Sequence, residues 1–80
     1  MVKWVSRVGS SVDDEQLGVH IMPNGAAVFQ DHEGYSHTGL TAENALAMAS
    51  VAAARTGKNV YVFLQDGAEW NSAWPYQLNE

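Results

Sequence analysis

A helix with clear signals at both ends constrains the fold of this chain most. Thr41 can cap its N-terminus, since the threonine hydroxyl accepts a hydrogen bond from an amide of the first turn. Gly57 marks its end, because helices commonly stop at a left-handed residue and glycine adopts that conformation without strain. We therefore predict a helix over residues 42–56. At about 100° per residue its small apolar side chains share one face, which we expect to pack on a sheet: Ala42, Ala45, Leu46, Ala49, Ala52 and Ala53.

Patterns typical of β-strands lie on both sides of the predicted helix. Before it, apolar and polar residues alternate with the two-residue period of a strand, and a turn at Asn24-Gly25 joins two such segments. We expect Gly39 to end the last strand before the helix. Asp66-Gly67 gives the same turn signal after the helix, so the following segment is expected to fold back as a hairpin. The expected strands cover residues 2–8, 17–22, 26–30, 59–65 and 68–74, and residues 35–38 are expected to extend the sheet beyond a second turn or a bulge at residues 31–34.

These elements predict an α+β domain in β-β-β-α-β-β order. The expected sheet is antiparallel, has four or five strands, and carries the alanine-rich helix packed on one face. Residues 2–8 are expected at an edge, with Lys3 and Arg7 facing water, whereas residues 59–65 are apolar on both sides and are expected at the centre. The chain has 80 residues and is expected to form one domain over residues 1–80.

Charge is distributed unevenly along the chain. The net charge is −5; Lys3 and Arg7 give the first eight residues +2, so the remaining residues carry −7. An acidic body disfavours direct binding of nucleic acid, because neutralising phosphates needs a basic patch. Carboxylates can instead dock on a partner protein whose own surface is basic. The acidic residues expected to face such a partner are Asp13, Asp14, Glu15, Asp31, Glu33, Asp66 and Glu69.

One observation favours the binding of nucleic acid in spite of the negative charge. Tyr61 and Phe63 would project from the same face of a central strand, where aromatic rings can stack on bases. Burial of the two rings in the domain is the alternative, and we expect it.

The sequence lacks the motifs that are typical of enzymes and metal sites. The chain has no cysteine, which excludes disulfides, thiolate metal sites and cysteine nucleophiles. Two of its histidines and two carboxylates lie close in sequence around a turn, and the third histidine is expected on the neighbouring strand. A zinc site, however, needs three fixed protein ligands, and this spacing matches no metal signature. The residues concerned are His20, His32, His37, Asp31 and Glu33. We expect no metal, no cofactor and no catalytic residue, and predict that the protein is not an enzyme.

Four apolar residues are further candidates for partner binding. Met48 and Val51 form a second stripe on the helix, which suits either the periphery of the core or a contact surface. Trp70 and Trp74 either pack against the sheet or anchor an interface, since tryptophan is common in both places. The partner expected from these residues is a protein, and a homodimer is the alternative to a different partner.

The order of elements resembles known groups of small proteins. The helix start Gly39-Leu40-Thr41-Ala42-Glu43-Asn44-Ala45-Leu46 resembles that of HicB-type antitoxins, and residues 17–70 resemble uncharacterised bacterial domains of β-β-α-β-β order. Size, acidity and element order are also similar to those of phage-encoded anti-CRISPR proteins of type I systems. That resemblance implies an inhibitor that binds a protein subunit of a host CRISPR–Cas complex.

We therefore expect a non-enzymatic, phage-type inhibitor that docks its acidic surface on a basic, nucleic-acid-binding surface of a host defence complex. A HicB-like antitoxin, or a self-associating regulatory or structural module, is the alternative. The first residues do not resemble a signal peptide, and residues 45–54 are about half as long as a membrane span. We expect no membrane association and a cytoplasmic location, in the host cell if the protein is encoded by a phage.

Overall fold

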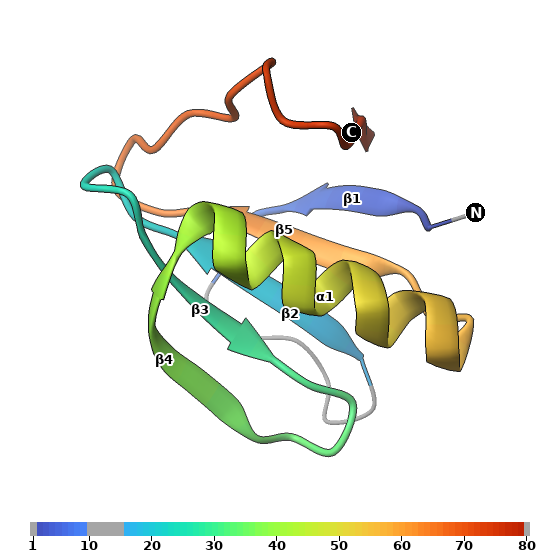
Figure 1. The fold of residues 1–80 in the computed structure, drawn as a ribbon. Coiled ribbons are helices and arrows are strands. Elements are labelled where there is room, and N and C mark those ends of the chain that lie inside the picture. The colour runs from blue at the N-terminus through green and yellow to red at the C-terminus, as the bar shows by residue number, and fades with distance from the viewer. Residues whose placement is uncertain (1, 10–15, 80) are drawn as a thin grey trace.

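A computed structural model describes residues 2–9 and 16–79, which form one sheet with one helix on one of its faces (Figure 1). The elements in chain order are β1 (Trp4–Arg7), β2 (Leu17–Ile21), β3 (Ala26–Gln30), β4 (Ser36–Thr41), α1 (Ala42–Thr56), β5 (Val60–Leu64) and β6 (Leu78–Asn79). Across the sheet the six strands of this part of the chain follow the order β4-β3-β2-β5-β1-β6. The α+β class, with its helix on one face of the sheet, is confirmed. The predicted count of four or five strands and the predicted β-β-β-α-β-β order are wrong, because residues 26–30 and residues 36–41 form two separate strands before the helix and β6 adds a further one after it.

The sheet is mixed, so the prediction of an antiparallel sheet is wrong. Neighbouring strands are antiparallel from β2 through β3 to β4, but β5 is parallel to both β2 and β1. The cause is α1, which carries the chain back along the sheet, so that β5 starts at the same end as β2. A crossover connection of this kind joins parallel strands, whereas a short hairpin joins antiparallel ones.

The position of β5 at the centre is confirmed, and it explains why the predicted hairpin at Asp66-Gly67 does not form. Both edges of β5 already pair with other strands, β2 on one side and β1 on the other. A returning strand over residues 68–74 would have no backbone groups to pair with, and this segment contains no strand. The chain still turns here: Asp66 and Gly67 have φ of 50° and 83°, and the Ala68 amide donates to the Gln65 carbonyl at 2.8 Å.

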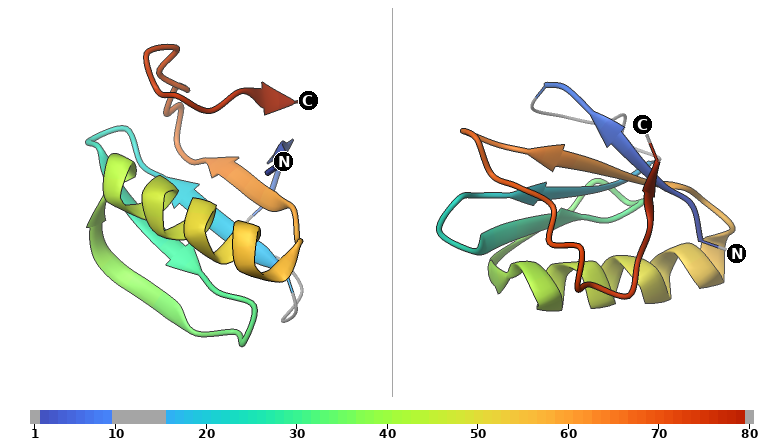
Figure 2. Two further views of the ribbon diagram at one scale, coloured as in Figure 1. Left: turned by 45° about the vertical axis from the view of Figure 1, so that its right-hand side comes forward. Right: turned by 90° about the horizontal axis from the view of Figure 1, so that it is seen from above.

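After this turn the chain crosses to the far side of β1. There β6 pairs with β1 in parallel, so β1 lies inside the sheet and the prediction of an edge strand for residues 2–8 is wrong. Figure 2 shows the segment between β5 and β6 on the same side of the sheet as α1. We call residues 66–77 the C-terminal segment. It packs on Trp4, whose ring is only 3% exposed and lies 4.5 Å from the ring of Tyr76, centroid to centroid.

The helix begins and ends as predicted. The Thr41 hydroxyl accepts a hydrogen bond from the Asn44 amide at 3.2 Å. Gly57 has φ of 71°, and its amide donates to the Ala53 carbonyl at 2.8 Å. The small residues of the predicted face are buried, apart from Ala52, which is half-buried; the buried ones are Ala42, Ala45, Leu46, Ala49 and Ala53. These methyl groups let α1 lie close to the sheet, mainly over β2 and β3.

The strand β4 continues through Gly39, which was expected to end it. Gly39 has φ of 72°, and the register between β3 and β4 shifts between Ala27 and Phe29. Two residues of β4 therefore stand opposite one residue of β3, which is a β-bulge. Glycine suits this position because it adopts a positive φ without strain.

No helix within residues 2–9 and 16–79 combines the length and the apolar character that crossing a membrane requires.

Candidate protein-docking surfaces

The structure gathers eight of the eleven predicted partner-binding residues into two regions. Asp66, Glu69, Trp70 and Trp74 lie in the C-terminal segment, where Glu69 and Trp74 share a cleft with the first turn of α1. Asp31, Glu33, Met48 and Val51 lie on the β3–β4 turn and on the outer side of α1. The other three, Asp13, Asp14 and Glu15, lie outside the described residues.

The first region is a cleft of about 370 Å³ between three parts of the chain. One wall is the turn between β2 and β3, another is the first turn of α1, and the third is the C-terminal segment. The Ala42 amide donates to the Gly25 carbonyl at 2.9 Å, which ties the start of α1 to the turn. We call this region the acidic cleft; the residues that line it are Ile21, Met22, Pro23, Gly25, Ala42, Glu43, Gly67, Ala68, Glu69, Asn71 and Trp74.

Two tryptophans support the wall that the C-terminal segment contributes. The rings of Trp70 and Trp74 meet edge to face, with centroids 4.9 Å apart and planes at 85°. Asn71 shapes the turn between them: its side-chain oxygen accepts from the Ala73 amide at 2.9 Å, and its carbonyl accepts from the Trp74 amide at 3.0 Å. Both tryptophans are half-buried, so Trp74 packs on the protein and also presents part of its surface to the cleft.

The acidic cleft has negative charge and no basic lining residue. Glu43 and Glu69 line it and are exposed, and exposed Asp66 stands beside its Gly67. None of these three carboxylates forms an ion pair within the described residues. Glu43 was missed as a site residue, because a glutamate in the first turn of a helix is sufficiently explained by the helix dipole. Its proximity to Glu69 depends on the path of the C-terminal segment.

The basic side chains lie elsewhere. Lys58 follows the end of α1, at the opposite end of the helix from the cleft, and the backbone of Lys3 meets the same end, where its carbonyl accepts from the Val60 amide at 2.9 Å. The Arg7 guanidinium lies over the Tyr61 ring at 4.9 Å from its centroid. Arg55 lies in the last turn of α1. None of these four basic residues lines the acidic cleft.

The second region is an apolar groove of about 540 Å³ between α1 and the β3–β4 hairpin. Met48 and Val51 line it from the helix and are 36% and 54% exposed, so neither belongs to the core. Phe29 and His37 line it from the hairpin, with their rings stacked at 5.5 Å between centroids. We call it the helix groove; the other lining residues are Asp31, His32, Ala47, Ala52, Arg55 and Thr56.

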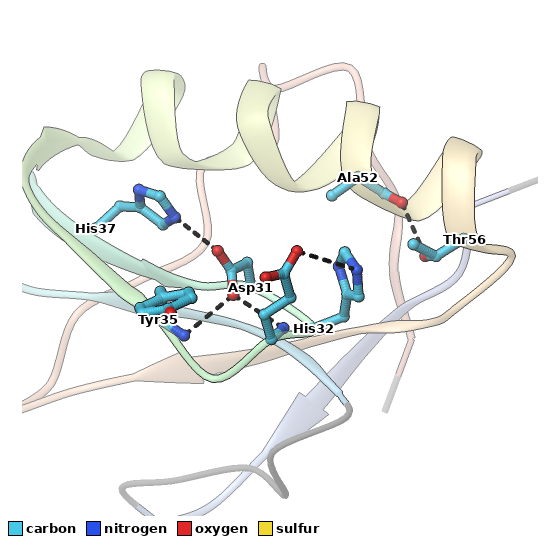
Figure 3. A network of polar contacts seen from close by, with 7 residues as sticks. Asp31, His32, Tyr35, His37, Ala52 and Thr56 are labelled. Carbon is cyan, nitrogen blue, oxygen red and sulfur yellow. Dashed lines mark hydrogen bonds and ion pairs between the residues drawn. The ribbon is translucent and has the colours of Figure 1, made fainter.

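The carboxylate of Asp31 organises the β3–β4 turn (Figure 3). Its Oδ1 accepts from the amides of Glu33 at 2.9 Å and Tyr35 at 3.0 Å, and its Oδ2 accepts from Nε2 of His37 at 2.9 Å. The hydrogen bond from His37, together with those from the two amides, holds the pKa of Asp31 below its ordinary value. The side chain is only 20% exposed. Asp31 was predicted to face a partner, and in the structure its carboxylate is engaged within the turn.

Replacing Asp31 with asparagine should destabilise the fold by about 1 kcal/mol near neutral pH, since the charge-assisted hydrogen bonds are lost. The folded pKa of Asp31 is lower than its unfolded value of about 3.9. The ionised carboxylate therefore stabilises the fold above that value, and the stabilisation is lost as the pH falls through the folded pKa. Urea unfolding of both proteins should show a stability difference that shrinks below about pH 4. An unchanged difference at pH 2 would contradict this role.

The three histidines do not assemble a metal site in the part of the chain that the structure describes. No group of three or more His, Asp or Glu side chains is close enough there to hold a metal ion. His32 lies beside Glu33, with Nε2 and Oε1 3.9 Å apart. His20 is stacked on Phe63 at 4.6 Å between ring centroids, and burial lowers the pKa of His20.

Tyr61 and Phe63 do not form the exposed pair of rings that was considered for stacking on nucleic-acid bases. Phe63 is only 3% exposed, so its ring cannot stack on a base. Tyr61 is half-buried beneath the guanidinium of Arg7.

No family model matches the chain, and neither the curated proteins nor the solved structures contain a match. The resemblances to anti-CRISPR proteins and HicB-type antitoxins therefore stay expectations. Function has to be inferred from the acidic cleft and the helix groove.

Proposed function

We propose that this domain is a non-enzymatic protein-binding module whose acidic cleft docks on the basic, nucleic-acid-binding surface of a partner protein. The observation that carries the proposal is the pair of exposed carboxylates, Glu43 and Glu69, which line one cleft together with Trp74 while no lysine, arginine or histidine lines it. Asp66 adds a third negative charge beside them.

This arrangement suits the side chains that bind phosphates. A lysine or arginine of the partner would gain charge-assisted hydrogen bonds from Glu43 and Glu69. The indole of Trp74 adds a face to which a cation is attracted. Surfaces that bind nucleic acid are rich in lysine and arginine, so an acidic protein can occupy them and exclude the nucleic acid. This is the mode of action that we expect of an anti-CRISPR-type inhibitor of a host defence complex.

The partner should be captured from host lysate through ionic contacts of the cleft. We expect Glu69→Gln to weaken capture about fivefold or more, because a paired charge at an interface is typically worth 1 kcal/mol or more. Asn59→Lys is the matched control: it changes the net charge by the same amount at an exposed position at the other end of α1, and it should leave capture almost unchanged.

The measurement is quantitative pull-down with tagged protein at low and high salt, followed by mass spectrometry and a nucleic-acid binding assay of the captured partner. Salt should release the partner, because ionic contacts between exposed groups are screened. The captured partner should bind its nucleic acid less well while the domain is present. Capture that resists both salt and Glu69→Gln, or a partner whose nucleic-acid binding is undisturbed, would contradict the proposal. A toxin as the captured protein would favour the antitoxin alternative.

A further inference from the structure

Exposed apolar side chains are concentrated around the helix groove, away from the acidic cleft. Four large apolar residues are exposed in the described part of the chain; Met48 and Val51 line the groove from α1, and Val8 follows β1 and does not line it. Tyr35, 66% exposed, lies on the hairpin that forms the opposite side. Isolated apolar residues are normal on a surface, but a contiguous apolar groove with a polar rim is typical of an interaction site.

The two sides of the groove carry opposite charges. Arg55 lines it from α1 and forms no ion pair within the described residues. On the hairpin side, Glu33 is 65% exposed and has only a 3.9 Å contact to His32, which itself lines the groove. Asp31 is already engaged with His37. Arg55 and Glu33 are therefore both available for ionic contacts outside their own molecule.

We propose that a second copy of this chain occupies the helix groove and forms a symmetric dimer. A two-fold rotation about the length of the groove places the hairpin of each copy over the α1 helix of the other. The positive side of each groove then faces the negative side of its partner, so the Arg55–Glu33 attraction occurs twice. Met48 and Val51 of each copy are covered in the same step. Two-fold symmetric contacts are the commonest form of association among soluble proteins.

The size of the domain limits the strength of this dimer. A stable interface buries about 800 Å² on each partner, which is roughly a sixth of the 4938 Å² surface of this domain. The 15 residues of α1 are about 22 Å long, so α1 and the hairpin together provide a contact at or below that size. We expect a dissociation constant in the micromolar range, since small interfaces are usually weak.

A charge exchange tests whether the occupant is a second copy. Arg55→Glu alone places two glutamates opposite each other at both contacts, and Glu33→Arg alone places two arginines there. Each variant should dimerise at least tenfold more weakly than the unmodified protein. Mixing the two variants in equal amounts should restore the dimer, because the two introduced side chains attract each other at one contact and the native pair forms at the other. No other occupant of the groove predicts this recovery.

Sedimentation equilibrium from about 1 µM to 1 mM protein measures each association constant. The double variant Met48→Glu/Val51→Glu should be monomeric with an unchanged circular dichroism spectrum. Ala54→Glu, at an exposed position of α1 that does not line the groove, is the matched control and should dimerise normally. An unmodified protein that stays monomeric throughout this range, or mixed charge variants that fail to associate, would overturn the proposal.

This inference stands apart from the function proposed for the acidic cleft, because the two surfaces share no lining residue. Glu69→Gln should lower partner capture and leave the dimer intact. Met48→Glu/Val51→Glu should abolish the dimer while a monomer still captures its partner. The failure of one proposal can therefore be told from the failure of the other.

Discussion

Replacing Trp4 with alanine should lower the free energy of unfolding by about 3 to 5 kcal/mol, the usual cost of removing a large buried aromatic side chain. Trp4 is 3% exposed and belongs to the core although it stands near the start of the chain. It connects three parts of the fold: its backbone pairs with Val60 in β5 and with Leu78 in β6, and its ring packs on Tyr76. Alanine would leave a cavity that none of these neighbours can fill.

The same substitution should also loosen the C-terminal segment, because this segment packs on the Trp4 ring. Guanidinium unfolding measures the loss of stability, and limited proteolysis reports the release of residues 66–77. Trp70→Ala is the matched control: Trp70 is half-buried, and we expect its removal to cost clearly less. Equal losses of stability for the two variants would contradict the role of Trp4 in the core. A C-terminal segment that stays protected from proteolysis in Trp4→Ala would show that Trp4 does not hold this segment in place.

Replacing Leu46 with alanine is expected to cost about 2 to 5 kcal/mol. Leu46 is fully buried and is the largest side chain on the face of α1 that packs on the sheet. Its neighbours on this face are alanines, which are too short to fill the space that a missing leucine leaves. A domain of this size is usually stable by only about 5 to 15 kcal/mol, so one such cavity removes a large share of the total.

The control for Leu46→Ala lies on the same helix. Met48 lies in the same helix as Leu46, but its side chain is exposed. Alanine favours a helix at least as well as methionine, so Met48→Ala does not lower the helix propensity of this segment. Its effect on stability should stay within about 0.5 kcal/mol. Urea unfolding of both variants provides the comparison. A small loss for Leu46→Ala would mean that α1 does not rest on the sheet through this residue.

Local signals in the sequence predicted local structure well. The hydroxyl of Thr41 and the left-handed Gly57 determine where α1 begins and ends, and both effects act within one helical turn. The Asn24-Gly25 turn joins two strands that are adjacent in the sheet, as its sequence indicates. Each of these features depends on residues that are neighbours in the chain, so a pattern in the sequence is sufficient to predict it.

Strand pairing could not be predicted in the same way, because an alternating pattern identifies a strand without identifying its neighbours. Asp66-Gly67 does turn the chain, but the strand before it has no free edge left to pair with. The apolar character of both faces of β5 had already indicated a central strand. A central strand has a neighbour on each side. The connection through α1 makes β2 one neighbour of β5, and no pattern of residues close together in the sequence predicts that pairing.

The candidate sites were predictable to a similar degree. Glu69 was a candidate because of its charge and Trp74 because of its aromatic ring, and both line the acidic cleft. Glu43 joins them only because the C-terminal segment folds back toward the start of α1. Asp31 was chosen for its charge, but its carboxylate accepts three hydrogen bonds inside its own turn. Composition identifies candidates, and the fold decides which of them are available to a partner.

Both edge strands of the sheet have features that hinder the sheet from growing into a filament. An exposed strand edge invites pairing with further molecules, and proteins prevent this with bulges or with very short edge strands. At one end, the bulge at Gly39 interrupts the regular spacing of β4. At the other end, β6 is two residues long. A straightened β4 would therefore be expected to aggregate, and in this domain association is left to side chains on surfaces away from the sheet edges.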